Sequence, residues 1–186
     1  MKNNKLAKLY IISAASGAGK TTIVKELLDK ISTLRVSVSH TTRPPRPLEK
    51  NGKDYHFVSI EEFEGMIEDG LFLEYAVCHG NFYGTSKDSV LSLLENGKDV
   101  ILEIDWQGAQ SIKKLFPEAK SIFIMPPSLE TLRERLIQRN QDSIEVIDSR
   151  MNAAEEEMSH ASEFDYVTIN NNLDETVGQL LQIINH

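Results

Sequence analysis

Cysteine is almost absent from this sequence, because Cys78 is the only one among 186 residues. A single cysteine cannot form an intramolecular disulfide, and it excludes a zinc site built from several cysteines. Long apolar runs are also missing, since no run approaches the ~18 residues that a membrane-spanning helix needs. The N-terminal segment lacks the plan of a signal peptide, because Lys8 breaks its apolar stretch and glycine-rich sequence follows. These absences predict a soluble, cytoplasmic protein with no membrane partner.

Basic residues are fewer than acidic ones. The sequence has 20 Lys and Arg against 28 Asp and Glu, a formal net charge of −8 and a pI near 5.2. A protein that coats nucleic acid is usually basic, so this balance argues against a nucleic-acid partner. The arginines are unevenly distributed, with Arg43 and Arg46 forming one pair and Arg133, Arg135, Arg139 and Arg150 lying in one later stretch. Two local arginine groups in an acidic protein suit the binding of small anions.

The length and composition fit one domain with a substantial core, since 40% of the residues are hydrophobic and 26% are charged. Short apolar runs alternate with helical patterns at both ends of the chain, which predicts an α/β fold with a parallel sheet flanked by helices. Two stretches interrupt this alternation. Residues 39–85 hold short strand patterns around one helix, typical of an inserted α+β subdomain. Residues 128–162 hold two helical patterns without a strand between them, typical of a helical flap.

Four local patterns predict particular elements. Strands are expected over Val36–Val38 and Asp99–Asp105. Ser59 opens a Ser-Ile-Glu-Glu pattern, a capping box that predicts the start of a helix. His79-Gly80-Asn81 lies between two strand patterns and predicts a hairpin turn.

The strongest motif follows an apolar strand over 9–12 and opens a helical pattern. It resembles the phosphate loop Gly-x-x-x-x-Gly-Lys-Ser/Thr, with one departure, since Ala14 replaces the first glycine. Ala14 raises a conformational question, because alanine disfavours positive φ. The backbone N–H groups of such a loop converge on an anion. The candidate ATP-binding residues of the motif are Ala14, Ala15, Ser16, Gly17, Ala18, Gly19, Lys20 and Thr21.

Two side chains of this motif have specific expected roles. Lys20 is expected to bridge the β- and γ-phosphates of a nucleotide, and the Thr21 hydroxyl to reach Mg²⁺. The structural alternative is a glycine-rich turn between strand and helix that carries an incidental lysine. The motif therefore predicts a binding site for the phosphates of a nucleotide, with Mg²⁺ as the cofactor that accompanies the nucleotide.

The segment Ser39–Arg46 is a second candidate anion site. Arg43 and Arg46 lie three residues apart on a proline-stiffened loop, and forked guanidinium donors fit phosphate oxygens. Ser39 and Tyr55 could add hydroxyl donors. Taken alone, the pattern fits a solvent-exposed loop equally well. Beside a phosphate loop it indicates a second phosphate site.

Acidic residues end the apolar pattern Ile101-Leu102-Glu103-Ile104-Asp105. In a phosphate-loop fold an acid at such a position can lie near Mg²⁺. Asp105 is the better candidate because it is expected to close the strand. Glu103 fits a merely solvated strand end equally well.

The order of these motifs resembles that of the guanylate kinases. After the phosphate loop the sequence has Ser-x-Ser-x-Thr-Thr-Arg-x-Pro-Arg from residue 37, Asn-Gly-Lys-Asp-Tyr-x-Phe from 51, Tyr-Gly-Thr from 83 and Asp-x-Gln-Gly from 105. The resemblance runs from about Lys8 to the end of the chain. It implies transfer of the γ-phosphate of ATP to GMP, giving ADP and GDP.

The resemblance also implies an organisation into three segments. It assigns residues 1–38, 86–127 and 163–186 to a core, residues 39–85 to a GMP-binding subdomain and residues 128–162 to a mobile lid. All three belong to one guanylate kinase domain over residues 1–186. The oligomeric state stays open.

For GMP, the resemblance implies that Ser39, Arg43, Arg46 and Tyr55 hold the phosphate and that Glu74 reads the guanine base. A carboxylate can accept the adjacent N1–H and N2–H₂ of guanine as a pair, and adenine lacks that pair. Thr85 corresponds to a hydroxyl that donates to guanine O6. The GMP-binding residues are completed by Tyr83, Glu103 and Asp105. Without the resemblance, the sequence around Glu74 would indicate only a polar residue on a strand.

For ATP and catalysis, the resemblance implies that Arg139 and Arg150 close over the phosphates. Arg135 is a weaker candidate near ATP, and Asn170 corresponds to a residue near the adenine. The catalytic set is Lys20, Arg43, Arg139 and Arg150, and the metal candidates are Thr21 and Asp105. Besides Ala14, the chain departs from the family at Glu103, where many members have Asp.

Two other functions remain as alternatives. A small-molecule kinase on the same scaffold could act on a sugar phosphate, although Glu74 and Thr85 favour guanine. A guanylate-kinase-like module that only binds proteins is the other, although such modules tend to lose the phosphate loop that Lys20 and Thr21 preserve here.

Overall fold

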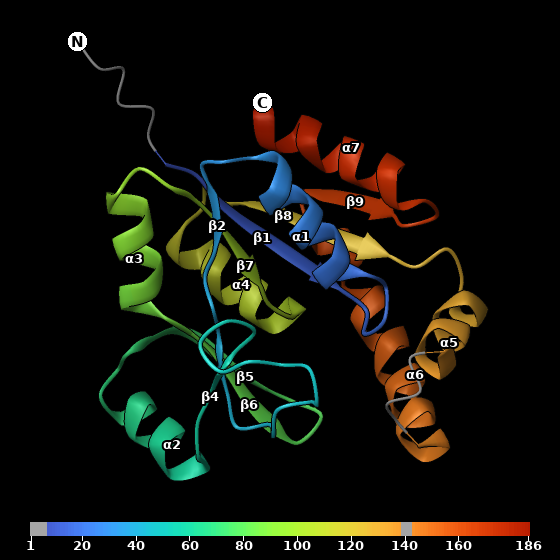
Figure 1. Ribbon diagram of the computed structural model, residues 1–186, viewed down its shortest axis with the longest axis horizontal. Coiled ribbons are helices and arrows are strands. Elements are labelled where there is room, and N and C mark those ends of the chain that lie inside the picture. The colour runs from blue at the N-terminus through green and yellow to red at the C-terminus, as the bar shows by residue number, and fades with distance from the viewer. Residues whose placement is uncertain (1–6, 139–142) are drawn as a thin grey trace. The chain divides into compact units, whose positions relative to one another are not determined.

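The structure is a computed structural model that describes residues 7–138 and 143–186 (Figure 1). Its elements divide between two compact units. The first unit comprises residues 1–9 and 33–119, and the second comprises residues 10–32 and 120–186. Each unit combines parallel strands with helices, which is the α/β class that the alternating sequence pattern predicts.

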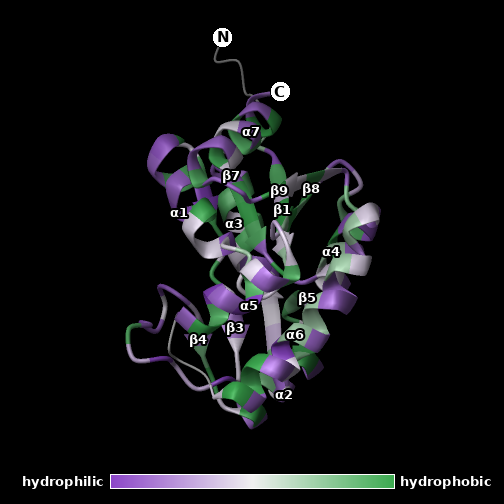
Figure 2. Cartoon of the chain, turned by 90° about the vertical axis from the view of Figure 1, so that its right-hand side faces the viewer, coloured by the Kyte–Doolittle hydropathy of each residue, from purple (hydrophilic) through white to green (hydrophobic). Residues whose placement is uncertain are grey.

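The second unit is built on a parallel sheet with the strand order β1-β8-β9. The strands span β1 (Leu9–Ala14), β8 (Lys120–Met125) and β9 (Tyr166–Ile169). Five successive residues at the start of β1 are buried, so both faces of this strand are covered, as a parallel sheet with helices on its faces requires. Figure 2 colours β1 as largely hydrophobic and much of helix α1 as hydrophilic.

Helices α1 (Lys20–Lys30) and α7 (Leu173–Asn185) lie side by side in this unit (Figure 1). In α1 the buried residues Ile23, Val24 and Leu27 form one helical face. The hydroxyl of Tyr10, buried in β1, donates to the carbonyl of Ile184 in α7 at 2.9 Å. This bond satisfies a polar atom inside the core and ties the sheet to α7.

Two further helices of the second unit, α5 (Leu129–Gln138) and α6 (Ile144–Ser159), pack against each other. They are followed by the short 3₁₀ helix η1 (Ala161–Glu163). Ser143 caps α6, because its hydroxyl accepts the backbone N–H of Val146.

In the first unit, β2 (Leu34–Val36) pairs in parallel with β7 (Asp99–Glu103). The predicted strand at residues 36–38 is therefore displaced by two residues. The displacement follows from the register, since Leu34 lies opposite Asp99 at the first residue of β7. Ser37 still donates its backbone N–H to the Ile101 carbonyl at 3.0 Å, just beyond the strand.

The first unit also holds a sheet with the strand order β4-β3-β6-β5. Its strands are β3 (His40–Thr41), β4 (His56–Phe57), β5 (Phe72–Cys78) and β6 (Asn81–Ser86), and its accompanying helices are α2 (Ile60–Glu68), α3 (Lys87–Glu95) and α4 (Trp106–Leu115). Ser59 caps α2 by accepting the N–H of Glu62, as its capping-box pattern predicts. The predicted hairpin turn between β5 and β6 is confirmed.

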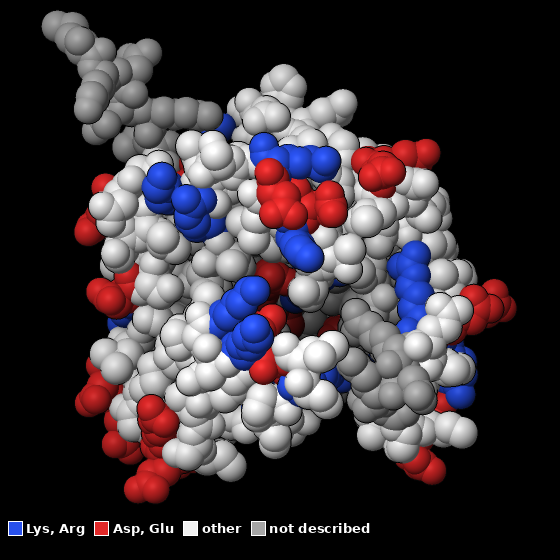
Figure 3. All heavy atoms as spheres, in the orientation of Figure 1, with Lys and Arg blue, Asp and Glu red and all other residues white. Residues whose placement is uncertain are grey.

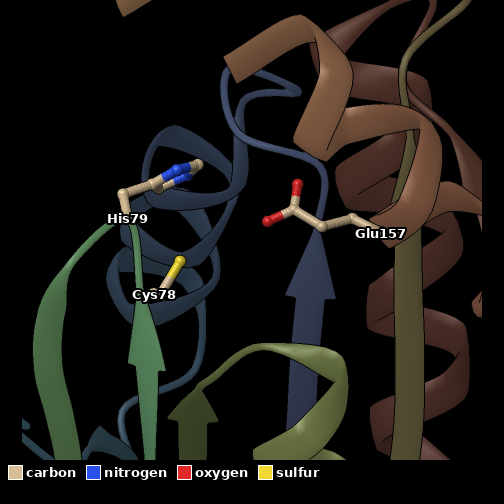
Figure 4. A group of neighbouring side chains, drawn as sticks. All are labelled: Cys78, His79 and Glu157. Atoms are coloured by element: carbon tan, nitrogen blue, oxygen red, sulfur yellow. The ribbon is translucent and has the colours of Figure 1, made fainter. Parts of the chain in front are cut away.

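The hairpin turn follows Cys78, the last residue of β5 (Figure 4). His79 and Gly80 have φ of 49° and 75°. Positive φ at two central residues is typical of a type I′ turn, whose twist matches that of the paired strands.

Gly84 in β6 lies beneath a stack of three phenylalanine rings. The ring centroids of Phe63 and Phe72 are 4.5 Å apart, and those of Phe63 and Phe82 are 5.2 Å apart. A Cβ added at Gly84 would meet the Phe72 ring at 2.8 Å and the Phe63 ring at 2.9 Å. The close approach of these rings therefore requires glycine.

Gly84→Ala is expected to lower the free energy of unfolding by about 1–3 kcal/mol, because the added methyl overpacks the ring stack. Gly65→Ala is the matched control, since a Cβ there meets no atom within 4 Å and the residue lies inside helix α2. That variant is expected to be more stable by roughly 0.5–1 kcal/mol. Urea unfolding of both variants checks the difference, and equal stabilities would show that the rings move aside freely.

Charged side chains of both signs are interspersed on the face drawn in Figure 3. Among residues 7–138 and 143–186, no helix has both the length and the apolar character needed to cross a membrane.

Candidate active site

The predicted phosphate loop connects β1 to α1. Ala14 is the last residue of β1 and lies in extended backbone, so its side chain meets no conflict with positive φ. Gly17 and Gly19 have φ of 95° and 99°, a region that side-chain-bearing residues rarely adopt. Lys20 is half-buried at the first position of α1. The first N–H groups of this helix have no intrahelical partner and therefore suit an anion.

Two side chains from outside the loop meet at the carbonyl of Ala18. The buried Asn170, directly after β9, donates its Nδ2–H to this oxygen at 2.8 Å. Arg135 on α5 donates to the same oxygen at 3.4 Å and to the Asn170 carbonyl at 3.1 Å. A Cβ at Gly19 would lie 2.6 Å from Asn170 Nδ2, so the approach of Asn170 also depends on glycine.

A cavity of about 370 Å³ lies beside this group. Arg135 and Asn170, both predicted near ATP, line the cavity together with Gly17 and Gly19. No sequence motif indicated the other lining residues, which are Thr22, Gln138, Asn171 and Leu173. Thr22 and Asn171 each follow a predicted residue directly, and this adjacency was the one signal that could have indicated them.

Helix α6 also contacts the loop. Glu157 on α6 (Figure 4) accepts the backbone N–H of Ser16 at 3.0 Å. Buried Ala15 of the loop packs with Leu132 of α5 and Ala154 of α6. The loop is thus attached to both helices of the predicted lid. Of the two predicted lid arginines, Arg150 is half-buried on α6, and Arg139 lies outside the described residues.

In the first unit, the structure brings together Arg43, Tyr55 and Tyr83. The Arg43 guanidinium carbon lies 5.5 Å from the centroid of the Tyr55 ring, and the two tyrosine rings are 5.9 Å apart. Burial raises the pKa of Tyr55 to about 12, and the charge of Glu103 adds to this rise. The phenol is therefore neutral near pH 7 and can donate a hydrogen bond.

The remaining residues of the predicted phosphate site lie close along the chain. Ser39 is buried directly before β3, and its carbonyl accepts the His56 N–H at 2.9 Å. Arg46 is half-buried, and its backbone N–H donates to Glu49 at 2.8 Å. Glu49 also lies in this site, where its carboxylate accepts hydrogen bonds from Arg43 and Arg46, although no sequence motif indicated it.

Glu74 is buried on β5, with 6% of its surface exposed, and lies opposite Thr85 on β6. The Thr85 hydroxyl donates to Glu74 Oε1 at 2.5 Å. A Cβ at Gly108 in α4 would lie 2.6 Å from Glu74 Oε2, so the start of α4 approaches the carboxyl closely. This approach gives a physical reason for the glycine in the Asp-x-Gln-Gly motif.

Asp105 lies in a different element from the one predicted. β7 ends at Glu103, and Asp105 is instead the N-cap of α4, where its Oδ1 accepts the Gly108 N–H at 2.9 Å. The prediction that Asp105 closes the strand is wrong, because the strand ladder stops before the cap. The capping bond turns this carboxylate toward the start of α4.

The Glu74 carboxyl has a strongly altered acidity. Burial, together with a smaller effect of the neighbouring Asp105 charge, raises the pKa of Glu74 to about 7, and the hydrogen bond from Thr85 opposes part of this rise. A carboxyl that is half ionised near neutral pH can change its hydrogen-bonding role within the working range of an enzyme.

This pKa predicts a pH dependence for any ligand whose N–H groups need the ionised carboxylate. From pH 8 to pH 6 the ionised fraction falls from about nine-tenths to about one-tenth, so affinity for such a ligand is expected to fall roughly tenfold. For GMP the KM is measured across this range, with Glu74→Gln as the control that cannot ionise. The phosphate of GMP titrates near pH 6 in both proteins. Identical pH profiles for the two proteins would contradict the assignment.

The chain is similar to known proteins over nearly its whole length. The sequence profile described as guanylate kinase matches residues 6–186. A guanylate kinase of Mannheimia succiniciproducens is 56% identical over 179 residues, covering 95% of this chain and 86% of that protein. A guanylate kinase of Coxiella burnetii is 52% identical over 178 residues, covering 96% and 86%.

A solved structure gives the same result for the fold. The crystal structure of guanylate kinase from Anaplasma phagocytophilum has a TM-score of 0.80 and 34% identity, and it covers 97% of this chain and 85% of that chain. The motif order, the parallel α/β architecture and these similarities agree, and the chain belongs to the guanylate kinase family.

Proposed function

We propose that this kinase transfers the γ-phosphate of ATP to GMP and releases ADP and GDP. The observation that carries the proposal is the buried pair of Glu74 on β5 and Thr85 on β6, a carboxyl acceptor with its hydroxyl donor, in a chain whose phosphate loop keeps Lys20 and Thr21. A buried carboxyl without a ligand is unfavourable, and the paired N–H groups of guanine would satisfy it.

Recognition of guanine would change the hydrogen bonds of this pair. Guanine N1–H and N2–H₂ would donate to the Glu74 carboxylate. The Thr85 hydroxyl has a single proton, which points to Glu74 in the structure, so donation to guanine O6 requires this proton to turn away from Glu74. The short Thr85 bond therefore holds the carboxyl in place until the base arrives.

The GMP phosphate would be held by Arg43, Arg46, Ser39, Tyr55 and Tyr83. Arg43 and the two tyrosines already lie together, and Tyr55 keeps its proton near neutral pH. Glu103 and Asp105 complete the proposed GMP site. We assign this site to a subdomain over residues 39–85 with contributions from the core.

ATP would bind along the phosphate loop, residues 14–21, with Lys20 on its β- and γ-phosphates. Its adenine would enter the cavity that Arg135 and Asn170 line, and Arg139 and Arg150 would close over the phosphates from a lid at residues 128–162. The exposed Thr21 hydroxyl suits the hard cation Mg²⁺, with Asp105 as a second candidate. When bound with ATP, Mg²⁺ would neutralise charge on the transferring phosphate.

The reaction needs no catalytic base. The acceptor is the phosphate of GMP, whose second pKa lies near 6, so it is largely a dianion at neutral pH. Catalysis then consists of aligning two anions and neutralising their charge, which Lys20, Arg43, Arg139 and Arg150 are proposed to do. Closure of the lid would keep water from accepting the phosphoryl group. We place the reaction in the cytoplasm.

A coupled assay of ADP release with ATP, Mg²⁺ and each of GMP, AMP, CMP and UMP tests this function. Turnover with GMP far above turnover with the other three is the expected result. ATP binding without turnover on any of them would favour the sugar-phosphate kinase. Failure to bind ATP would favour the protein-binding module.

A further inference from the structure

The guanidinium of Arg43 is held by Glu49. Arg43 Nη2 donates to both carboxylate oxygens of Glu49, at 2.8 and 2.9 Å. Both side chains are largely buried, with 15% and 17% of their surfaces exposed. Charge-assisted bonds in such surroundings are stronger and more directional than those of exposed ion pairs.

Both the backbone and the side chain of Glu49 form hydrogen bonds with the backbone of Arg46. Its backbone N–H donates to the Arg46 carbonyl at 3.0 Å, and its carboxylate accepts the Arg46 backbone N–H at 2.8 Å. These reciprocal bonds close a tight turn over residues 46–49. The carboxylate is therefore fixed within the loop that carries Arg43 and Arg46. It has little freedom to move away when a ligand binds.

The other contacts of Arg43 complete its orientation. Nη1 donates to the Pro44 carbonyl at 2.7 Å, and the guanidinium carbon lies 5.5 Å and 5.8 Å from the Tyr55 and Phe57 ring centroids. Because Glu49 engages Nη2, a phosphate would be met through Nη1 and Nε. Tyr83 interacts with the same guanidinium. The arginine is thus held in one orientation beside the aromatic residues of the proposed phosphate site.

We propose that Glu49 is a positioning residue for the GMP phosphate, an inference that rests on the proposed function. By fixing Arg43 in the free protein, Glu49 removes the loss of side-chain entropy that an unrestrained arginine would suffer on binding. Glu49 also carries a negative charge near the phosphate dianion, which by itself would weaken binding. Positioning of Arg43 strengthens GMP binding, whereas the negative charge weakens it. The direction in which GMP affinity changes in a variant without the charge therefore shows which effect is larger.

Glu49→Gln keeps the size of the side chain and one acceptor oxygen but removes the charge. GMP affinity, measured by titration calorimetry, is expected to fall about tenfold, because charge-assisted bonds to Arg43 are lost. Guanosine affinity and the KM for ATP are expected to stay within about twofold of wild type. A purely structural role would weaken guanosine and GMP equally, and that result would overturn the proposal.

Glu49→Asp provides the second variant, since it keeps the charge but shortens the reach to Arg43. It is expected to weaken GMP binding as the Gln variant does. Tighter GMP binding in Glu49→Gln would show that charge repulsion outweighs positioning, and wild-type binding in Glu49→Asp would show that the placement of the carboxylate does not matter. Either result would overturn the proposal.

Glu64→Gln is the matched control, because Glu64 is exposed on α2 and its loss changes the net charge by the same amount. It is expected to leave GMP binding unchanged. Wild-type protein without GMP turnover would defeat the proposed function itself. Active wild type with unchanged GMP binding in Glu49→Gln would defeat this inference alone.

Discussion

Lys20→Ala is expected to remove nearly all turnover of ATP and GMP, with kcat falling on the order of 10³-fold or more. Lys20 is the cation of the phosphate loop, half-buried where α1 begins. Negative charge builds up on the β–γ bridging oxygen as its bond to the γ-phosphorus breaks, and a fixed cation stabilises this charge without reorganising. The loop N–H groups remain in the variant, so ATP binding should be weakened less than the chemical step.

The measurement is kcat in the coupled ADP-release assay with saturating ATP, Mg²⁺ and GMP. Lys25→Ala is the matched control, because Lys25 is an exposed lysine on the same helix. Its activity is expected to equal that of wild type. Near-normal turnover in Lys20→Ala would refute the assignment of the phosphate loop.

Glu74→Ala is expected to raise the KM for GMP by roughly 10²-fold and to reduce the preference for GMP over AMP by a similar or larger factor. The carboxylate stabilises bound guanine by accepting two N–H donors. Bound adenine is disfavoured because it would leave the buried carboxylate unpaired. Removal of the carboxylate abolishes both effects. Because kcat depends mainly on the phosphates, it should change less than KM.

Glu74→Gln sharpens this test because the side chain keeps its volume beside Gly108 and Thr85. An amide presents one acceptor and one donor, which matches the N6–H₂ and N1 of adenine better than the two donors of guanine. Relative kcat/KM for GMP and AMP should therefore shift toward AMP. Unchanged discrimination in both variants would show that another residue reads the base.

The candidate site could be predicted from the sequence where its residues are contiguous. The segment Ala14–Thr21 was recognisable because a strand, a glycine-rich turn and a helix start succeed each other directly, and the loop needs little from elsewhere to bind an anion. Glu74 could not be predicted in this way, because the residues around it in the sequence do not indicate that its side chain is buried. Its assignment came from the resemblance to guanylate kinases, and its raised pKa came from burial and from the nearby Asp105.

The errors in prediction also have physical causes. Asp105 was assigned to a strand because the apolar run points to it, but pairing with β2 ends earlier and leaves it as a helix cap. Glu49 was missed because a glutamate in a proline-rich loop resembles any solvated acid. Its role arises from a turn that returns its carboxylate to Arg43.

The α/β class, the phosphate loop and the family follow from the order of the residues, since they depend on local periodicity, backbone conformation at glycines and contiguous motifs. Folding in three dimensions sets which groups share a partner, as Arg135 and Asn170 do at the Ala18 carbonyl. Folding also sets which carboxyl is buried enough for its pKa to reach neutrality. The reason is that burial and long-range hydrogen bonds join residues far apart in the chain, and their free energies depend on surroundings that no local pattern records.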